Sequence, residues 1–316
     1  MPAMRVSIVI VNWKTPRLLA DCLDTIAQDP KHADFEIWVV DNNSGDESVE
    51  MLGRDYPYVK VLANDFNAGF SKGCNQVIPL CTAPYILLLN PDTKVEDCAI
   101  SKLADFLDSN QACGAVGPKV LNFDGTLQHA CRRAFPDPAA AFFRVTYLSR
   151  LFPNSPTFSR YNYSFADPDD LLEVDALSGS CMMVRREVVE KVGLLDEDIF
   201  MFGEDIDWCW RIKQAKWTVN YYPKAVVYHI HGAASRFRPI GTTIDLHKGM
   251  HVFYKKHLAQ KYWAPFNLLV YAAIWSRAAI FVVVNWLRAV ATSSAAKQVA
   301  VASAAEKLEV RSGNLK

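Results

Sequence analysis

The sequence of 316 residues predicts an α/β fold, in which a mostly parallel sheet is covered by helices. Short apolar runs rich in β-branched residues, typical of strands buried on both faces, alternate with segments whose apolar residues recur at helical spacing. Two of the strand runs end in polar groups, Asp41–Asn43 and Asn90–Asp92. Ligands of parallel sheets bind outside the carboxyl ends of the strands, so these groups predict a pocket for a nucleotide-type ligand.

The first half of the chain shows the clearest alternation. An apolar run at 6–11 predicts the first strand, and Pro16 opens a helical pattern after it. Further buried strands are expected at 36–40, 59–62 and 85–89, joined by right-handed crossovers. The sequence lacks the Gly-rich motifs that cradle phosphates, so a metal ion is the expected partner of any phosphate bound here.

The second half is less regular. Residues 131–176 are rich in Pro and aromatic residues and predict an insert or long loop over the sheet, where acceptor specificity often resides. A strand is expected at 177–184. Helical spacing after it places Glu204 and Asp205 at a helix N-terminus, whose partial positive charge favours ionised carboxylates. With Asp207, three carboxylates fall within four positions, a crowding typical of a functional site.

The C-terminal segment differs in kind, because Arg277 is the only formal charge between 263 and 287. A membrane-spanning helix would hold this charge at a cost of roughly 2.5–3.5 kcal/mol, which a hairpin or an interface-lying helix pair avoids. The alternatives are a buried helix and a dimer contact. Basic residues suited to anionic lipid on the cytoplasmic side precede the segment: Lys255, Lys256, His257 and Lys261.

Composition excludes several classes of function. The 34 basic residues equal the 34 acidic ones, so no global basic field supports nucleic-acid binding. Eight cysteines form no Cys-x-x-Cys pair, which argues against a zinc knuckle and favours buried thiols in a reducing compartment. The N-terminus lacks a basic region followed by a cleavable apolar core, so no signal peptide is expected.

Taken together, the motifs resemble those of a known family. Five of them occur in the order seen in inverting family 2 glycosyltransferases: Val9–Trp13, Val40–Ser44, Asn67–Phe70, Leu89–Asp92 and Phe202–Trp208. From about residue 5 to residue 257, the chain particularly resembles the bacterial rhamnosyltransferase-like branch. The resemblance implies the GT-A fold, a Rossmann-like nucleotide-binding sheet flanked by helices, and chemistry on a nucleotide sugar.

The resemblance also divides the chain. Residues 1–130 are expected to be the nucleotide-sugar-binding half of the GT-A domain, and 131–257 the acceptor-binding and catalytic half of the same domain. Residues 258–292 are expected to form apolar, membrane-associating helices. Residues 293–316, rich in Ala, Ser and Lys, predict a loosely held helix or tail.

The donor site follows from the same motifs. The resemblance implies that Asp41 accepts a hydrogen bond from a pyrimidine base, although a strand-end turn residue is the alternative. Asn90–Asp92 matches the Asp-x-Asp metal motif with Asn in the first position, so Asp92 would be the main carboxylate on Mg²⁺ or Mn²⁺. His229 matches a further metal ligand, with His231 as its rival. The implied donor-binding set is Val11, Asn12, Asp41, Asn43, Asn67, Gly69, Asn90 and Asp92.

The acidic cluster supplies the implied chemistry. Asp205 matches the general base that takes the proton of the acceptor hydroxyl. Glu204 is the second candidate for the base and is expected to support the acceptor side. Asp207 is expected to be structural, and Trp208 either packs behind it or lines the acceptor site. Four arginines could contact an anionic acceptor lipid: Arg132, Arg133, Arg236 and Arg238.

These expectations combine into one leading function. The chain is predicted to be an inverting, metal-dependent glycosyltransferase of cell-surface polysaccharide biosynthesis at the cytoplasmic face of the membrane. Its donor would be a dTDP- or UDP-sugar, with dTDP-L-rhamnose the best candidate, and its acceptor a glycan, expected to be lipid-linked. A homo-oligomer is compatible with the sequence. The alternative is a non-catalytic sugar-nucleotide or glycan-binding partner in a membrane assembly, which Asn90 in place of an acidic residue allows.

Overall fold

The computed structural model of the protein describes residues 4–230 and 232–287. Its centre is a nine-stranded sheet in the order β3-β2-β1-β4-β10-β6-β11-β5, with β8 paired to β11. The strands are β1 (Val6–Asn12), β2 (Phe35–Asp41), β3 (Lys60–Ala63), β4 (Tyr85–Leu89), β5 (Thr93–Glu96), β6 (Cys113–Leu121), β8 (Leu172–Glu173), β10 (Cys181–Arg185) and β11 (Thr218–His229). A separate two-stranded ladder pairs β7 (Arg132–Arg133) with β9 (Ala176–Leu177).

The sheet is parallel where the sequence alternates most clearly and mixed elsewhere. Strands β3, β2, β1 and β4 pair in parallel, as predicted. Strand β10 lies antiparallel between β4 and β6, and β5 and β8 pair antiparallel with β11. Because β10 comes from the second half of the sequence, the two predicted halves share one sheet.

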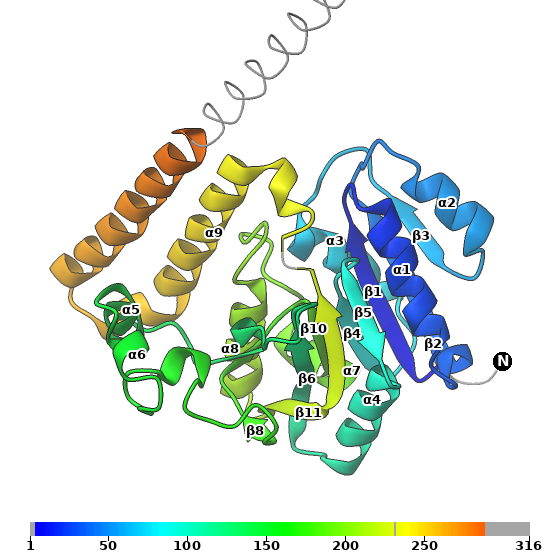
Figure 1. The fold of residues 1–316 in the computed structure, drawn as a ribbon, viewed down its shortest axis with the longest axis horizontal. Coiled ribbons are helices and arrows are strands. Elements are labelled where there is room, and N and C mark those ends of the chain that lie inside the picture. The colour runs from blue at the N-terminus through cyan, green and yellow to red at the C-terminus, as the bar shows by residue number, and fades with distance from the viewer. Residues whose placement is uncertain (1–3, 231, 288–316) are drawn as a thin grey trace, which may run out of the picture.

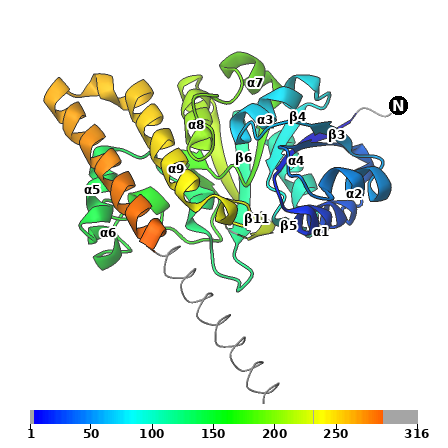
Figure 2. The same ribbon diagram turned by 90° about the horizontal axis from the view of Figure 1, so that it is seen from above.

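Helices cover both faces of this sheet (Figures 1 and 2). They are α1 (Pro16–Ala27), α2 (Ser48–Asp55), α3 (Phe70–Val77), α4 (Ala99–Ser109), α7 (Arg186–Val192), α8 (Glu204–Gln214) and α9 (Pro239–Phe253). Short 3₁₀ turns occur at His32–Asp34, Ile78–Leu80, His129–Cys131, Arg160–Asn162 and Ser235–Phe237. Alternate residues of β1 point to opposite faces: Ile8 packs in one core cluster with the α1 residue Leu23, and Val9 in the other with the α3 residue Val77.

The irregular insert contains two short helices, α5 (Pro138–Val145) and α6 (Leu148–Leu151). Asp137 caps α5, because its carboxylate accepts a hydrogen bond from the Ala140 amide at 2.7 Å. Both helices lie at the edge of the molecule, near the C-terminal apolar helix (Figures 1 and 2).

The C-terminal region begins as α9 and continues through a π-helical turn (Tyr254–Leu258) and a 3₁₀ turn (Ala259–Lys261). A second helix, Ala264–Leu287, then runs back beside α9 (Figure 1). By length and composition this helix could cross a membrane. The predicted helical segment at 258–292 is thus a helix as far as Leu287, and the predicted tail at 293–316 lies outside the described residues.

Candidate functional site

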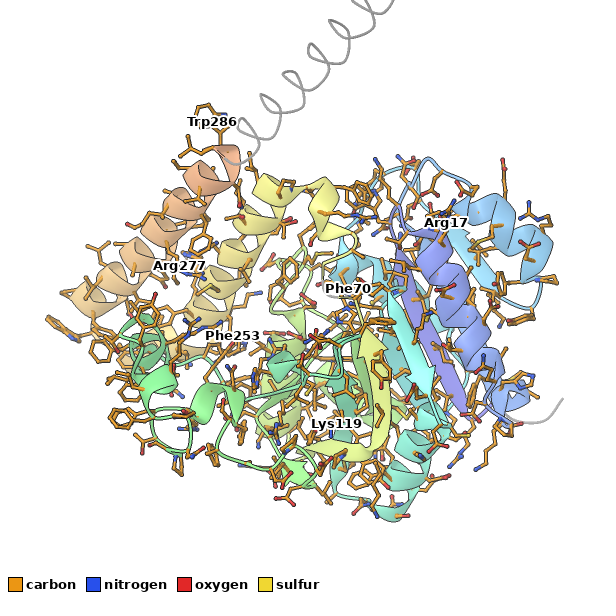
Figure 3. The ribbon with its side chains drawn as sticks, viewed as in Figure 1. Arg17, Phe70, Lys119, Phe253, Arg277 and Trp286 are labelled. Carbon is orange, nitrogen blue, oxygen red and sulfur yellow. The ribbon has the colours of Figure 1, made fainter. Side chains whose placement is uncertain are left out.

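A cleft of about 630 Å³, partly open to solvent, lies at the carboxyl ends of the parallel strands. The first half of the chain contributes one wall: Val11, Trp13, Asn42, Asn67, Gly69, Phe70, Asn90, Pro91 and Asp92. The second half contributes the other: Phe200, Met201, Ala234, Ser235, Arg238, Thr242 and Asp245. Figure 3 labels Phe70 at the junction of the two halves. The structure therefore brings five of the eight predicted donor-site residues to one cleft.

The other three, Asn12, Asp41 and Asn43, do not line it. Asn12 and Asp41 are buried, and the Asn12 amide donates to Asp41 Oδ1 at 2.9 Å. Ser44 donates its hydroxyl to the same oxygen at 2.6 Å and its amide to Oδ2 at 3.0 Å. Asn43 is exposed and donates to the Asp65 carbonyl at 2.9 Å. The carboxylate at the end of β2 is thus held rigidly by its neighbours.

Asn42, which belongs to the predicted polar group at 41–43 but not to the predicted donor-binding set, is the residue of this group that lines the cleft. Its side-chain amide donates to the Gly69 carbonyl at 3.0 Å, and its oxygen accepts from Asn64 at 2.9 Å. Asn42 therefore links the end of β2 to the start of α3. Its position beside Asp41 was the available signal, because alternate residues leaving a strand point to opposite sides.

The turn before α3 depends on its glycine. Gly69 has a φ of +85°, and an added Cβ would lie 2.7 Å from the Phe200 carbonyl oxygen and 2.6 Å from its ring. The Phe70 amide donates to the same carbonyl at 2.8 Å, and Asn67 Oδ1 accepts from the Gly69 amide at 3.0 Å. A side chain at 69 would push the two walls of the cleft apart.

Two metal-ligating groups meet at the floor of the cleft. Asp92 Oδ1 lies 3.2 Å from His229 Nε2, and both side chains are buried. Asp92 Oδ1 has no hydrogen-bond partner among the described residues. The Asn90 amide lies 3.3 Å from His229 Nε2. Burying a carboxylate oxygen without a hydrogen-bond donor costs free energy, so a positively charged group is expected beside Asp92 Oδ1.

Gln128 fixes the state of this histidine, and sequence reasoning missed it. Gln128 Oε1 lies 2.9 Å from His229 Nδ1, while its amide nitrogen donates to the His229 carbonyl at 2.7 Å. An amide oxygen only accepts, so this contact favours a proton on Nδ1, and Nε2 is the ring nitrogen that faces Asp92.

This donor set fits a divalent cation. A carboxylate oxygen and an imidazole nitrogen suit Mg²⁺ or Mn²⁺, which also take water and substrate phosphate oxygens as ligands. No cluster of three or more His, Cys, Asp or Glu residues suited to a metal occurs within 4–230 and 232–287. Substrate and water would therefore supply the rest of the coordination. The rival ligand His231 lies outside the described residues.

The acidic cluster begins at a tight turn. Phe202 and Gly203 both have positive φ, of 69° and 108°, and a Cβ added to Gly203 would lie 3.7 Å from the backbone of Gly249 on α9. The helix α8 starts directly after them, as predicted, with Glu204, Asp205 and Asp207 in its first turn. The three carboxylates therefore leave the helix in different directions and meet different surroundings.

Asp205 is surrounded by hydrogen-bond donors. Its Oδ2 accepts from Arg133 at 2.6 Å and from the Gly179 amide at 2.9 Å, and its Oδ1 accepts from the Ile206 amide at 2.8 Å. An added Cβ on Gly179 would lie 3.5 Å from the Asp205 Cβ and 3.7 Å from the Phe70 ring. Asp205 therefore lies behind the cleft wall that Phe70 forms, paired with Arg133.

Glu204 has the opposite surroundings. It is buried, and its Oε2 has no hydrogen-bond partner among the described residues. Burial raises the pKa of Glu204 to about 8, and the charge of Asp205 acts in the same direction. Like Asp205, Glu204 is not among the residues that line the cleft, and its expected support of the acceptor side stays a prediction.

Asp207 and Trp208 belong to the core behind the site. Burial would raise the pKa of Asp207, but hydrogen bonds from His257 Nε2 at 2.6 Å and Arg211 at 2.8 Å hold it below the usual value. Trp208 is fully buried and donates to the Gly193 carbonyl at 2.9 Å. Of the two placements weighed for Trp208, the structure shows packing behind the helix, and the indole cannot line the acceptor site.

The arginines expected to contact an acceptor lipid have other partners. Arg132 is buried and donates to the carbonyls of Ala166 and Asp167, and Arg133 is committed to Asp205. Arg238 instead lines the cleft, with its guanidinium 3.6 Å from Asp245. The acceptor-lipid expectation is therefore wrong for Arg132 and Arg133.

Comparisons with known proteins identify a family and relatives of this chain. The model of the family described as glycosyltransferase like family 2 matches residues 2–239. An N-acetylglucosaminyl-diphospho-decaprenol L-rhamnosyltransferase of Mycobacterium tuberculosis is 28% identical over 229 residues, covering 69% of this chain and 73% of the relative. A dTDP-rhamnosyl transferase of Shigella flexneri is 23% identical over 261 residues, covering 80% of each chain.

Solved structures are similar in fold. A mannosyltransferase from Pyrobaculum calidifontis in complex with GDP-Man and Mn²⁺ has a TM-score of 0.55 at 17% identity, covering 88% of this chain and 76% of its own. GalNAc-T7 with UDP, GalNAc and Mn²⁺ has a TM-score of 0.54 at 16% identity, covering 73% of this chain and 44% of its own. These likenesses confirm the predicted GT-A fold.

Proposed function

This chain belongs to glycosyltransferase family 2, and from that premise we propose that it moves a single sugar from a nucleotide donor to a glycan hydroxyl with inversion. L-rhamnose from a dTDP donor is the best candidate, because two of the relatives described above are named as rhamnosyltransferases. The observation that carries the proposal is the contact of Asp92 Oδ1 and His229 Nε2, 3.2 Å apart, on the floor of a cleft with Asp205 behind its wall.

The donor would lie along the wall built by the first half of the chain. Asn42, Asn67 and Gly69 offer polar backbone and side-chain groups to the nucleoside. Asp41 would act from behind this wall, either by orienting Asn12 and Ser44 or by reaching the base after a local shift. Asp92 and His229 would hold Mg²⁺ or Mn²⁺, which, when bound, would offset the charge that develops on the leaving diphosphate.

Asp205 would be the general base. Its Oδ1 accepts one hydrogen bond, from the Ile206 amide, and keeps capacity for a second. As the acceptor oxygen forms its bond to the anomeric carbon, Asp205 takes the hydroxyl proton, and the bond from that carbon to the diphosphate breaks. A single displacement inverts the anomeric centre. Arg133 keeps Asp205 fixed and charged before the reaction.

The proposal extends to the acceptor and to its place in the cell. We assign the donor half to residues 1–130 and the acceptor-binding and catalytic half to 131–257, with the irregular insert over the acceptor side. A lipid-linked glycan at the cytoplasmic membrane face is the expected acceptor, with 258–292 associating with the membrane. The Mycobacterium tuberculosis relative, which is named for N-acetylglucosaminyl-diphospho-decaprenol, supports this assignment.

Thermal-shift measurements with nucleotide sugars and Mn²⁺ test the donor. A true donor at 100 times its dissociation constant stabilises the folded state by about 2.7 kcal/mol. dTDP-rhamnose plus Mn²⁺ should raise the melting temperature, and Asp92→Ala should abolish the part that depends on Mn²⁺. The donor assignment fails if neither dTDP- nor UDP-sugars shift the melting curve.

A second candidate function is a non-catalytic binding protein for a sugar nucleotide or glycan. The observation that favours it is Asn90 at the first position of the metal motif. A transfer assay with Mn²⁺ separates the two functions. If wild type, Asp205→Asn and Asp92→Ala all show the same background turnover, the binding function is correct and the enzyme assignment of these residues is wrong.

A further inference from the structure

The helix Ala264–Leu287 leaves one face uncovered. Only a small part of it is buried, and large apolar side chains on its outer face are exposed, among them Leu268 at 69%, Ile280 at 62% and Val283 at 54%. Trp263 at its start and Trp286 at its end are also exposed, and Figure 3 shows Trp286 at the outer end of the helix. Tryptophans at the ends of an apolar stretch are typical of a membrane–water interface.

The inner face of the same helix is polar and bonded to α9. Arg277 donates to His247 Nε2 at 2.9 Å, Asn285 donates to Thr243 Oγ1 at 2.9 Å, and Trp275 Nε1 lies 3.4 Å from His251 Nδ1. Figure 3 places Arg277 between the two helices. The charge that made a membrane span expensive is therefore turned away from the apolar face.

The insert carries a second exposed apolar patch. On α5, α6 and the residues around them, Phe142 is 58% exposed, Val145 70% and Leu151 68%, with Tyr147 and Phe152 exposed beside them. These helices lie next to the apolar helix in both views (Figures 1 and 2). Arg144 on α5 is close enough that its charge adds to burial in lowering the pKa of Arg277. The two patches are therefore neighbours.

Charge distinguishes these two segments from the rest of the chain. Residues 138–166 and 246–287 contain no Asp or Glu, although the whole chain has 34 acidic residues in 316 and a net charge of zero. Lys and Arg remain throughout, at Arg144, Arg150, Arg160, Lys248, Lys255, Lys256, Lys261 and Arg277. Two of them pair with acidic residues of other segments, Arg160 with Asp175 and Lys256 with Asp196 and Asp198. An apolar surface whose own segments carry basic but no acidic residues complements an anionic lipid surface.

We propose that α5–α6 and the helix Ala264–Leu287 form one docking surface for anionic phospholipid, and that the helix lies along the head-group region instead of crossing the bilayer. Crossing would break the three polar contacts with α9 or draw Lys248 and Asp245 of α9 into hydrocarbon. A second copy of the chain is a poor occupant, because a symmetric contact would set two surfaces of the same positive charge, with Arg144 and Arg150 on each, against one another. The proposed lipid-binding surface does not depend on the proposed sugar transfer. It would nevertheless place the cleft near a lipid-linked acceptor.

Vesicle flotation of the full chain tests the surface. Binding to phosphatidylcholine vesicles containing about 30% phosphatidylglycerol should be at least about ten-fold tighter than to phosphatidylcholine alone, and should weaken with salt. The double variant Phe142→Ser/Leu151→Ser should lose about ten-fold in binding. Its matched control, Tyr58→Ser/Leu80→Ser, removes two similarly exposed apolar side chains elsewhere and should bind like wild type.

The outcomes distinguish between anionic lipid and a second copy of the chain as the partner of this surface. Unchanged vesicle binding by the insert variant overturns the role of α5–α6. No vesicle binding by wild type, with a dimer in light scattering that the same variant dissociates, identifies a second copy as the occupant. Trypsin added outside intact vesicles should cut after Lys297 or Lys307, and protection of these sites would show that the helix crosses. Thermal shift with a nucleotide sugar should be the same in all variants, which separates failure of this surface from failure of the donor assignment.

Discussion

The floor of the cleft and the start of α8 both hold buried carboxylates, but they are satisfied in different ways. Asp92 Oδ1 faces an imidazole nitrogen and has no hydrogen-bond partner among the described residues, whereas Asp205 accepts bonds from Arg133, Gly179 and Ile206. On the proposed function, the floor would be completed by a cation that arrives with the substrate. The helix start is organised beforehand, as expected of a group that must meet a developing charge without rearrangement.

The largest expected effect comes from replacing Asp205 at the start of α8. Asp205→Asn keeps the shape of the side chain but cannot take a proton, so kcat should fall by about 10²–10⁴-fold. Donor binding, followed by thermal shift with Mn²⁺, should stay within a few-fold of wild type. A kcat within ten-fold of wild type would place the base elsewhere.

The affinity for Mn²⁺ can be lowered without replacing either proposed ligand, Asp92 or His229. Gln128→Leu removes the bond that sets the proton of His229, and Mn²⁺ affinity should fall by about 10–100-fold, measured by titrating Mn²⁺ into the nucleotide-dependent thermal shift. Asn122→Ala is the matched control, because Asn122 accepts from Gln128 at 2.8 Å but does not contact the imidazole. Equal losses in both variants would contradict the proposed role of Gln128.

The position of α8 depends on a close backbone contact. A Cβ added to Gly249 would lie 2.0 Å from the Phe202 carbonyl oxygen, so Gly249→Ala should reduce the free energy of unfolding by about 1–3 kcal/mol. Gly53→Ala, in the open at α2, should be neutral or stabilising. Urea unfolding measures both. Mn²⁺ affinity of Gly249→Ala should not change if the two sides of the cleft are independent.

An effect of another kind concerns Glu204 and appears as a pH dependence of stability. Its pKa is raised to about 8 in the folded state, against about 4.3 in an unfolded chain. Between these values the folded protein binds more protons than the unfolded one, so this residue makes stability fall as pH rises, by at most about 1.4 kcal/mol per pH unit. Glu204→Gln should flatten that decline between pH 5 and 8 in urea unfolding. An identical pH profile in the variant would show that Glu204 is not the cause.

Much of the fold follows from local pattern. The parallel strands β1, β2, β3 and β4 and the start of α8 were predicted within one or two residues, because periodicity and turn residues act over short stretches. The antiparallel insertion of β10 between β4 and β6 could not be predicted, since it pairs residues more than 60 positions apart. The pattern of a strand does not encode its neighbours.

The site divides in the same way. Polar residues at strand ends predicted the floor of the cleft, since position in the sheet determines them. The side chains that bond to the site residues are distant in the sequence: Arg133 is 72 residues from Asp205, and Gln128 is 101 residues from His229. Both lie where the sequence has no periodic pattern. For Trp208, the local sequence could not decide between the two expected placements. A tryptophan beside an acidic cluster has the same neighbours in the sequence whether its side chain is buried or exposed.

The bond between Asp207 and His257 has a practical consequence for handling the protein. His257 lies in the π-helical turn that joins α9 to the apolar helix, and Asp207 lies two residues after Asp205. A shortened chain that ends before His257 would leave Arg211 as the remaining side-chain partner of the buried Asp207 carboxylate. A chain that ends after Lys261 keeps His257 while discarding the apolar helix. The end point of a shortened chain therefore decides whether Asp207 keeps both of these partners behind the start of α8.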